Sequence, residues 1–198
     1  MAKILQIIGI VGILSAFSCA PGISTSPHVI VDSLLVDLYG EALVARAADS
    51  WGPALDLRSR SVAQHDEALA ASRSKKESDT LYLLAIEGLS DDGTLCPGAR
   101  TFPYRINGDA HTYGHGGVAC IDVRVGAAIA QSVLAHEIGH AIGLAHDPRP
   151  DALMFIYRGS VEPTCYDFVQ LSHVLGTVVP ERCRVQLPQL DVIGESRS

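Results

Sequence analysis

The sequence has little charge, and basic charge is the scarcer sign. Only 19% of its residues are charged, and 15 Lys and Arg stand against 22 Asp and Glu, which gives a formal net charge of −7. The densest basic stretch, residues 72–77, is short and reads as a solvated loop. Because proteins that bind nucleic acids need Lys and Arg clustered against the phosphates, the composition argues against a nucleic-acid partner.

No apolar run at the N-terminus reaches the roughly 20 residues that a membrane-spanning helix needs. Residues 4–17 form a shorter uncharged run after Lys3, so residues 1–19 are predicted to be the signal peptide of an exported protein. The end of this segment partly resembles the bacterial lipobox, which makes Cys19 a candidate lipidation site. Two locations stay open: anchored to the cell envelope as a lipoprotein through Cys19, or secreted after cleavage behind Ala20.

No two cysteines have the C-x-x-C spacing that cysteine-based zinc sites commonly use, so such a site is not expected. Four cysteines remain after the signal segment, and an even number in an exported protein favours two disulfides. Their sequence positions alone permit more than one pairing. We favour Cys96 with Cys120 and Cys165 with Cys183, because each pair closes a loop of moderate length.

The length of 198 residues, 47% of them hydrophobic, suits one globular domain with short appendages. We assign residues 20–28 to a tether, 29–185 to the domain and 186–198 to a C-terminal tail. Hydrophobic periodicity and turn residues predict strands at 29–36, 55–62, 80–87, 102–106 and 118–125, and helices at 37–51, 126–145 and 165–175. This order predicts an α/β (α+β) fold in which a single sheet lies under two helices.

Three segments between these elements carry further expectations. Residues 80–87 (TLYLLAIE) are almost continuously apolar, which is typical of a strand buried on both faces at the centre of a sheet. Residues 64–78 are predicted to be a short surface helix or a loop. Residues 108–117, rich in Gly and His, are predicted to be a loop, and the scattered His28, His65 and His173 are interpreted as surface residues.

The long helix predicted at 126–145 contains the motif with the clearest chemistry, H-E-x-x-H. His136 and His140 are four residues apart and therefore lie on one face of the helix, where both rings can reach one ion. Gly143 permits a sharp exit from the helix, and His146 returns as a third ligand. Three imidazoles with one open coordination position describe a catalytic zinc site, and Glu137 beside them is the candidate general base.

A bare H-E-x-x-H also occurs by chance on helix surfaces, but here the pattern extends further. Residues 136–147 (HEIGHAIGLAHD) resemble the long zinc signature of the metzincin metallopeptidases, and residues 152–154 (ALM) resemble their Met-turn. The resemblance implies a zincin domain with one mostly parallel twisted sheet, an active-site helix, a backing helix and a C-terminal helix. It also implies that Met154 is a hydrophobic floor beneath the zinc. Asp147, directly after the third histidine, is similar to the adamalysin branch, whereas residues 152–154 are more like the matrixin branch.

One catalytic zinc ion is expected. A second, structural zinc or calcium ion near His111 and His115 is the less favoured alternative, because the acidic residues that accompany such a site in matrixins are missing. The default interpretation of both histidines is solvent-exposed loop residues.

The sequence therefore predicts an exported, monomeric zinc endopeptidase, a hydrolase that acts on a peptide or protein substrate through water activated by Glu137. Two alternatives stay open. One is a catalytically inactive zinc-bearing surface binding protein, against which the presence of Glu137 argues, because zinc binding alone does not need that carboxylate. The other is a zinc amidase that acts on cell-wall peptides with the same metal chemistry.

Overall fold

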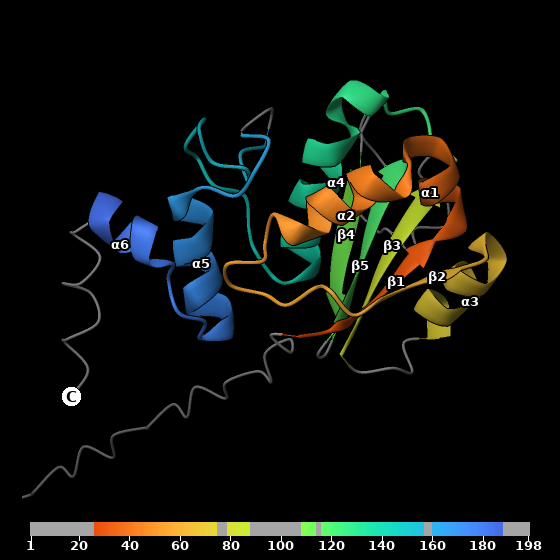
Figure 1. The fold of residues 1–198 in the computed structure, drawn as a ribbon, viewed down its shortest axis with the longest axis horizontal. Coiled ribbons are helices and arrows are strands. Elements are labelled where there is room, and N and C mark those ends of the chain that lie inside the picture. The colour runs from red at the N-terminus through yellow and green to blue at the C-terminus, as the bar shows by residue number, and fades with distance from the viewer. Residues whose placement is uncertain (1–25, 75–78, 88–107, 114–115, 157–159, 188–198) are drawn as a thin grey trace, which may run out of the picture.

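The computed structural model describes residues 26–74, 79–87, 108–113, 116–156 and 160–187. Its strands are β1 (His28–Asp32), β2 (Arg60–Ala63), β3 (Thr80–Ile86), β4 (Gly108–Tyr113) and β5 (Gly116–Asp122). Its helices are α1 (Ser33–Tyr39), α2 (Glu41–Asp49), α3 (His65–Ser74), α4 (Ala127–Ala141), α5 (Cys165–Leu175) and α6 (Glu181–Gln186). Figure 1 shows the sheet with its helices, and α5 and α6 beside them.

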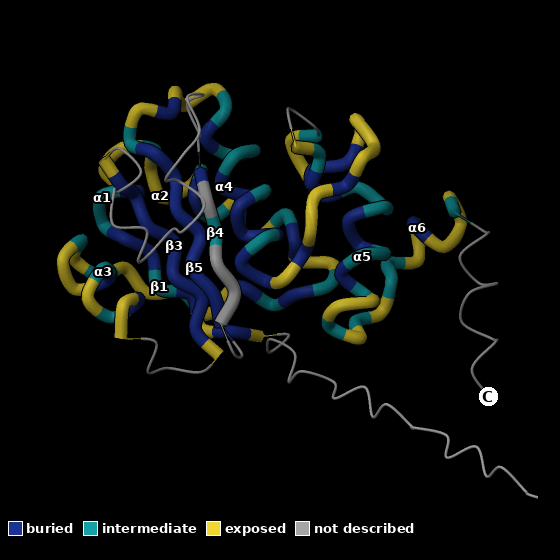
Figure 2. The backbone as a smooth tube through the Cα atoms, turned by 180° about the vertical axis from the view of Figure 1, so that it is seen from behind, coloured by how far each residue is buried: buried dark blue, intermediate teal, exposed yellow. Residues whose placement is uncertain are grey.

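The strands form one sheet in the order β2-β1-β3-β5-β4. All neighbours are parallel except β4, which is antiparallel to β5 at the edge. Every residue of β3 and β5 is buried, as Figure 2 shows for the middle of the sheet. The predicted fold is therefore confirmed: a single, mostly parallel sheet with an active-site helix (α4), a backing helix (α2) and a C-terminal helix (α5).

Helices cover the two faces of the sheet differently. On one face α1, α2 and α4 bury a large core, to which β3 contributes Leu81, Leu83 and Ala85. On the other face α3 covers a smaller cluster that includes Tyr82 and Leu84. Because successive side chains of a strand point to opposite faces, the unbroken apolar run of β3 supplies both cores.

The first predicted strand and helix differ from the observed elements. The strand expected at 29–36 ends at Asp32, because its carboxylate Oδ1 accepts the N–H of Leu34 at 2.9 Å and caps a new helix, α1. The helix expected at 37–51 is divided by Gly40, whose φ of 79° is incompatible with a continuous α-helix. His65, expected at the surface, is half-buried and bonds Asp32 Oδ2 through Nδ1 at 2.6 Å.

Two further sequence predictions were wrong in detail. The strand expected at 55–62 is confined to β2, and the buried Leu55 and Leu57 lie in the connection before it. Burial rather than strand pairing thus explains their alternating pattern. Residues 108–113 are not a loop but the antiparallel edge strand β4. The edge strand expected at 102–106 lies outside the described residues.

The C-terminal part agrees more closely with the sequence. α5 spans the residues predicted for it, and the disulfide between Cys165 and Cys183 is confirmed. Cys120 is also disulfide-bonded; Cys96, its predicted partner, lies outside the described residues, so that pairing stays a prediction. The short helix α6 was not predicted.

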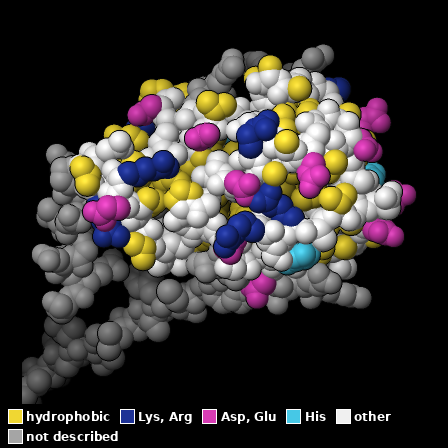
Figure 3. Space-filling view, in the orientation of Figure 1, with side chains coloured by type: hydrophobic (Ala, Val, Ile, Leu, Met, Phe, Trp, Pro, Cys, Tyr) yellow, Lys and Arg dark blue, Asp and Glu magenta, His cyan; other side chains and the backbone are white. Residues whose placement is uncertain are grey.

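On the face shown in Figure 3, Lys and Arg side chains lie scattered among Asp, Glu and apolar side chains.

Within the described ranges, none of the helices combines the length and the apolar character needed to cross a membrane.

Candidate metal centre

Helix α4 carries His136, Glu137 and His140 and is held firmly in place. It packs against β4, β5 and α2. The indole Nε1 of Trp51, a fully buried residue that follows α2, donates to the carbonyl oxygen of Ala135 at 3.0 Å. This bond fixes α4 one residue before the first histidine of the motif.

His136, His140 and His146 converge, as the sequence predicts. One ring nitrogen of each lies within 4.8 Å of the others, and no other comparable group of His, Cys, Asp or Glu occurs among the described residues. The Nε2 atoms of His140 and His146 are 3.1 Å apart. Two nitrogens bound tetrahedrally to one zinc ion at the usual Zn–N length lie roughly 3.3 Å apart, so the donor set fits zinc.

Backbone carbonyls orient two of the three rings. The Nδ1 atom of His136 lies 2.7 Å from the carbonyl oxygen of Leu153, and that of His140 lies 2.8 Å from the carbonyl oxygen of Leu144. A carbonyl can only accept, so each Nδ1 carries the hydrogen and each Nε2 keeps its lone pair. This tautomer is the one in which Nε2 binds a metal ion.

Two of the histidines, His136 and His146, are also held in the neutral form that a metal requires. Burial lowers the pKa of His136 to about 4, with smaller contributions from His140 and His146. Burial and the neighbouring His140 likewise lower the pKa of His146. The lone pairs are therefore available at neutral pH without removing a proton.

Glu137 follows His136 on α4 and is only 7% exposed. It lies between His136 and His140 in the sequence of α4, and part of its side chain lies against Gly108, the first residue of β4. A carboxylate in such a place is suited to exchanging a proton with a group bound beside the histidines.

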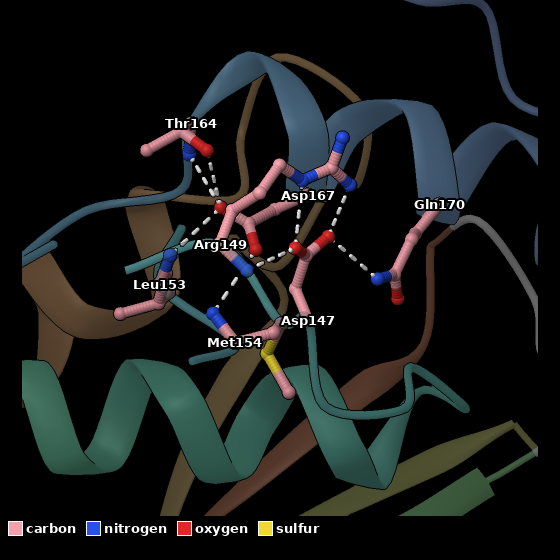
Figure 4. Close-up of polar contacts among 7 residues, drawn as sticks. All are labelled: Asp147, Arg149, Leu153, Met154, Thr164, Asp167 and Gln170. Atoms are coloured by element: carbon pink, nitrogen blue, oxygen red, sulfur yellow. Dashed lines mark hydrogen bonds and ion pairs between the residues drawn. The ribbon is translucent and has the colours of Figure 1, made fainter. Parts of the chain in front are cut away.

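The turn at residues 152–154 is held to α5 by hydrogen bonds from Leu153 and Met154 (Figure 4). Met154 is fully buried, and its side chain lies against α4 at Gly139. The carboxylate of Asp167, a fully buried residue of α5, accepts the N–H groups of Leu153 and Met154 at 3.0 Å each. Asp167 also accepts the N–H and the hydroxyl of Thr164.

A second buried carboxylate holds the segment that carries His146. Asp147 is 1% exposed, and its carboxylate accepts from the guanidinium and the N–H of Arg149 and from the amide of Gln170 at 3.0 Å. The Arg149 hydrogen bond lowers the pKa of Asp147. The N–H of Asp147 donates to the carbonyl oxygen of Met154 at 2.8 Å. Helix α5 thus fastens both the turn and the third histidine.

The remaining residues that the sequence predicted for a site lie outside the histidine cluster or outside the described residues. The disulfide between Cys165 and Cys183 joins α5 to α6. His111 belongs to β4, but its side chain, His115 and Cys19 are outside the described residues, so a second metal and a lipid stay predictions. Asp167 was not predicted as a site residue, although Thr164-x-x-Asp167 has the spacing of a capping box at the start of a helix.

The match to a protein-family model agrees with this geometry. The family model for matrixin, a peptidase family, matches residues 46–170. No curated protein sequence matches the chain. A solved structure of a zinc-dependent peptidase from Methanocorpusculum labreanum is similar at 19% identity, with a TM-score of 0.38, over 81% of this chain and 98% of that one. Because the family match covers more than half of the chain and includes the converging histidines, the chain belongs to the matrixin family of zinc-dependent peptidases.

Proposed function

We propose that the chain is an exported zinc endopeptidase in which His136, His140 and His146 hold one zinc ion and Glu137 is the general base. The convergence of three histidine rings supports this proposal most directly, because one ring nitrogen of each lies within 4.8 Å of the others and can bind the same ion. No fourth side chain belongs to that cluster among the described residues, which is the donor set of a catalytic rather than a structural zinc ion.

The proposed chemistry divides between the metal and the carboxylate. A zinc ion in such a site supplies Lewis acidity, which activates water and polarises the carbonyl group of the scissile peptide bond. Glu137 accepts a proton at its carboxylate from the attacking water and returns it to the departing amine. Its burial beside the histidines supports this role, because a proton acceptor acts best when bulk water does not compete for it.

The edge of the sheet supports cleavage within extended peptides. β4 is the outermost strand in the sheet order, and it packs against α4, which carries Glu137. An extended peptide that pairs with an edge strand lies along it, and its scissile bond can then face the helix behind. Met154 beneath α4 is proposed to be the hydrophobic floor of the metal site.

Export is proposed from the N-terminal segment, and the cysteines support it. The Cys165–Cys183 disulfide and the disulfide-bonded Cys120 are expected in an oxidising compartment rather than in a reducing one. The mass of the mature N-terminal peptide distinguishes a lipid-modified Cys19 from an unmodified N-terminus produced by cleavage behind Ala20.

The test of this function is zinc-dependent cleavage of a peptide library by the purified mature protein, read by mass spectrometry. We expect cuts at internal bonds, loss of cutting with a chelator, and recovery when zinc is added back. Cuts only at chain ends would contradict an endopeptidase. If the zinc-loaded protein cuts no peptide, the proposed function is wrong.

A further inference from the structure

Gly108, the first residue of β4, lies against the side chain of the proposed general base. A Cβ atom built at Gly108 would lie 2.6 Å from Cγ and 2.8 Å from Oε1 of Glu137, and 2.8 Å from the carbonyl oxygen of Cys120. Real Cβ atoms do not come this close to other heavy atoms. The edge strand can therefore pass the Glu137 side chain at this distance only with a glycine at this position.

This contact restricts Glu137 from the side opposite to its helix. The backbone of α4 fixes its Cα, since α4 is packed against β4 and β5. The bare backbone of β4 then meets the side chain from Cγ to Oε1. With both ends of the side chain confined, the carboxylate has a defined place relative to the histidines of the same helix.

The backbone at Gly108 cannot yield easily to an added methyl group. Gly108 pairs with Ile121 in the antiparallel ladder, and a Cβ atom at this position would also meet the Cys120 carbonyl. Strand backbone in a ladder is held by several hydrogen bonds, whereas the Glu137 side chain turns about single bonds. A methyl group at position 108 must therefore displace the Glu137 side chain, and it also crowds the Cys120 carbonyl.

We propose that Gly108 is a positioning residue for catalysis: the side-chain-free backbone of the edge strand sets the place of the Glu137 carboxylate. This inference rests on the proposed role of Glu137 as general base. Since a misplacement of about 1 Å at a reacting group costs on the order of 100-fold in rate, Gly108→Ala is expected to lower kcat by about that factor. KM is expected to change by no more than about two-fold, because no peptide-binding group is removed.

Gly126→Ala is the matched control. Gly126 precedes α4, has a φ of −69°, and a Cβ built there meets nothing within 4 Å. The same chemical change at this open position is thus expected to leave kcat and zinc content unaltered. Both variants are assayed on the library peptide that the wild-type protein cleaves fastest, and zinc is measured by elemental analysis.

A second measurement does not depend on activity. Glu137→Ala removes Cγ and the carboxylate, so Gly108→Ala should be tolerated better in that background than in the wild type. We expect the drop in the thermal unfolding midpoint caused by Gly108→Ala to shrink by about half or more when Glu137 is absent. The remainder reflects the crowded carbonyl of Cys120.

The outcomes separate the two proposals. A kcat loss at unchanged zinc content, together with a reduced midpoint drop in the Glu137→Ala background, supports the positioning role. Wild-type kcat in Gly108→Ala, or an equal midpoint drop in both backgrounds, overturns it even if the wild-type protein is an active peptidase. If the wild-type protein cleaves nothing while the midpoint coupling persists, the proposed function is overturned and the contact between Gly108 and Glu137 stands.

Discussion

His136 donates its Nδ1 hydrogen to the carbonyl oxygen of Leu153 at 2.7 Å, and the N–H of the same Leu153 donates to Asp167 at 3.0 Å. A line of hydrogen bonds therefore runs from α5, through the turn at residues 152–154, to the first histidine of the cluster. The orientation of His136 depends on a carboxylate that does not touch the ring. The strength of that dependence can be measured at Asp167.

Asp167→Asn is expected to weaken both the fold and the metal site. Four hydrogen-bond donors point at the two carboxylate oxygens of Asp167. An asparagine amide has only one oxygen to accept them, and the hydrogens of its NH₂ group would face the remaining donors. We expect the free energy of unfolding to fall by about 2–4 kcal/mol, from the unsatisfied buried groups. Zinc affinity, measured by competition with a chelator, should fall by roughly 10- to 100-fold.

The control for this change is Asp151→Asn, which makes the same substitution at an exposed residue close to the turn. This control variant should change neither the free energy of unfolding nor the zinc affinity appreciably. If both variants behave alike, Asp167 does not support the site.

The buried state of His136 gives the zinc-free protein a characteristic pH dependence. The pKa of His136 is lowered to about 4 in the fold, against an ordinary value of 6.5, so the unfolded chain binds more protons between these values. This group's contribution to stability is complete above pH ~6.5 and is lost as the pH falls toward ~4. Urea unfolding midpoints of the zinc-free protein should therefore decrease over that window.

His136→Asn removes the titrating ring but keeps an amide hydrogen that can reach the Leu153 carbonyl. The variant should show a shallower decrease over the same window. An identical pH profile for the two proteins would assign the effect to other groups.

Gly139→Ala tests the contact beneath α4. A Cβ at Gly139 would collide with the Met154 sulfur and would lie 3.0 Å from Cζ2 of Trp51. Alanine is preferred over glycine within helices by ~1 kcal/mol, so in open space this change would stabilise the protein. We instead expect a loss of about 1–3 kcal/mol in the free energy of unfolding, because both neighbours are fully buried. Ala70→Gly on the exposed side of α3 is the control, because it measures the intrinsic helix preference of alanine over glycine in the same protein. A gain in stability from Gly139→Ala would contradict close packing of Met154 and Trp51 against Gly139.

Replacing both Cys165 and Cys183 by alanine removes the link between α5 and α6. The two residues are 18 positions apart, and a disulfide that closes a loop of this size contributes about 3 kcal/mol. Urea unfolding should show a loss of this order. A change of less than ~1 kcal/mol would mean that packing alone holds α6 on α5.

The sequence predicts the centre of this protein better than its periphery. β3 was recognisable because a strand buried on both faces has no polar positions, and α4 because the signature fixes where a helix must bring two imidazoles together. The predicted disulfide between Cys165 and Cys183 is also present in the structure. In each case the residues that determine the structure are close together in the chain.

The misassigned segments depend on contacts between distant residues. Residues 108–113 look like a loop in isolation, since they begin with Gly and Asp, which are depleted in strands, and they become a strand through pairing with β5. Leu55 and Leu57 have the alternation of a strand but are buried without strand pairing. The spacing Thr164-x-x-Asp167 indicates a helix cap, but the bonds from Asp167 to the turn at 152–154 form only because α5 returns to that turn.

The most direct test of the account is a paired measurement on Glu137→Gln: zinc content by elemental analysis and cleavage of the peptide that the wild-type protein cuts fastest. The three histidines are unchanged in this variant, so we predict the wild-type content of zinc. We also predict a fall in kcat of at least about 100-fold, because the amide cannot accept the proton of the attacking water. Undiminished cleavage by a zinc-loaded Glu137→Gln protein would contradict the account.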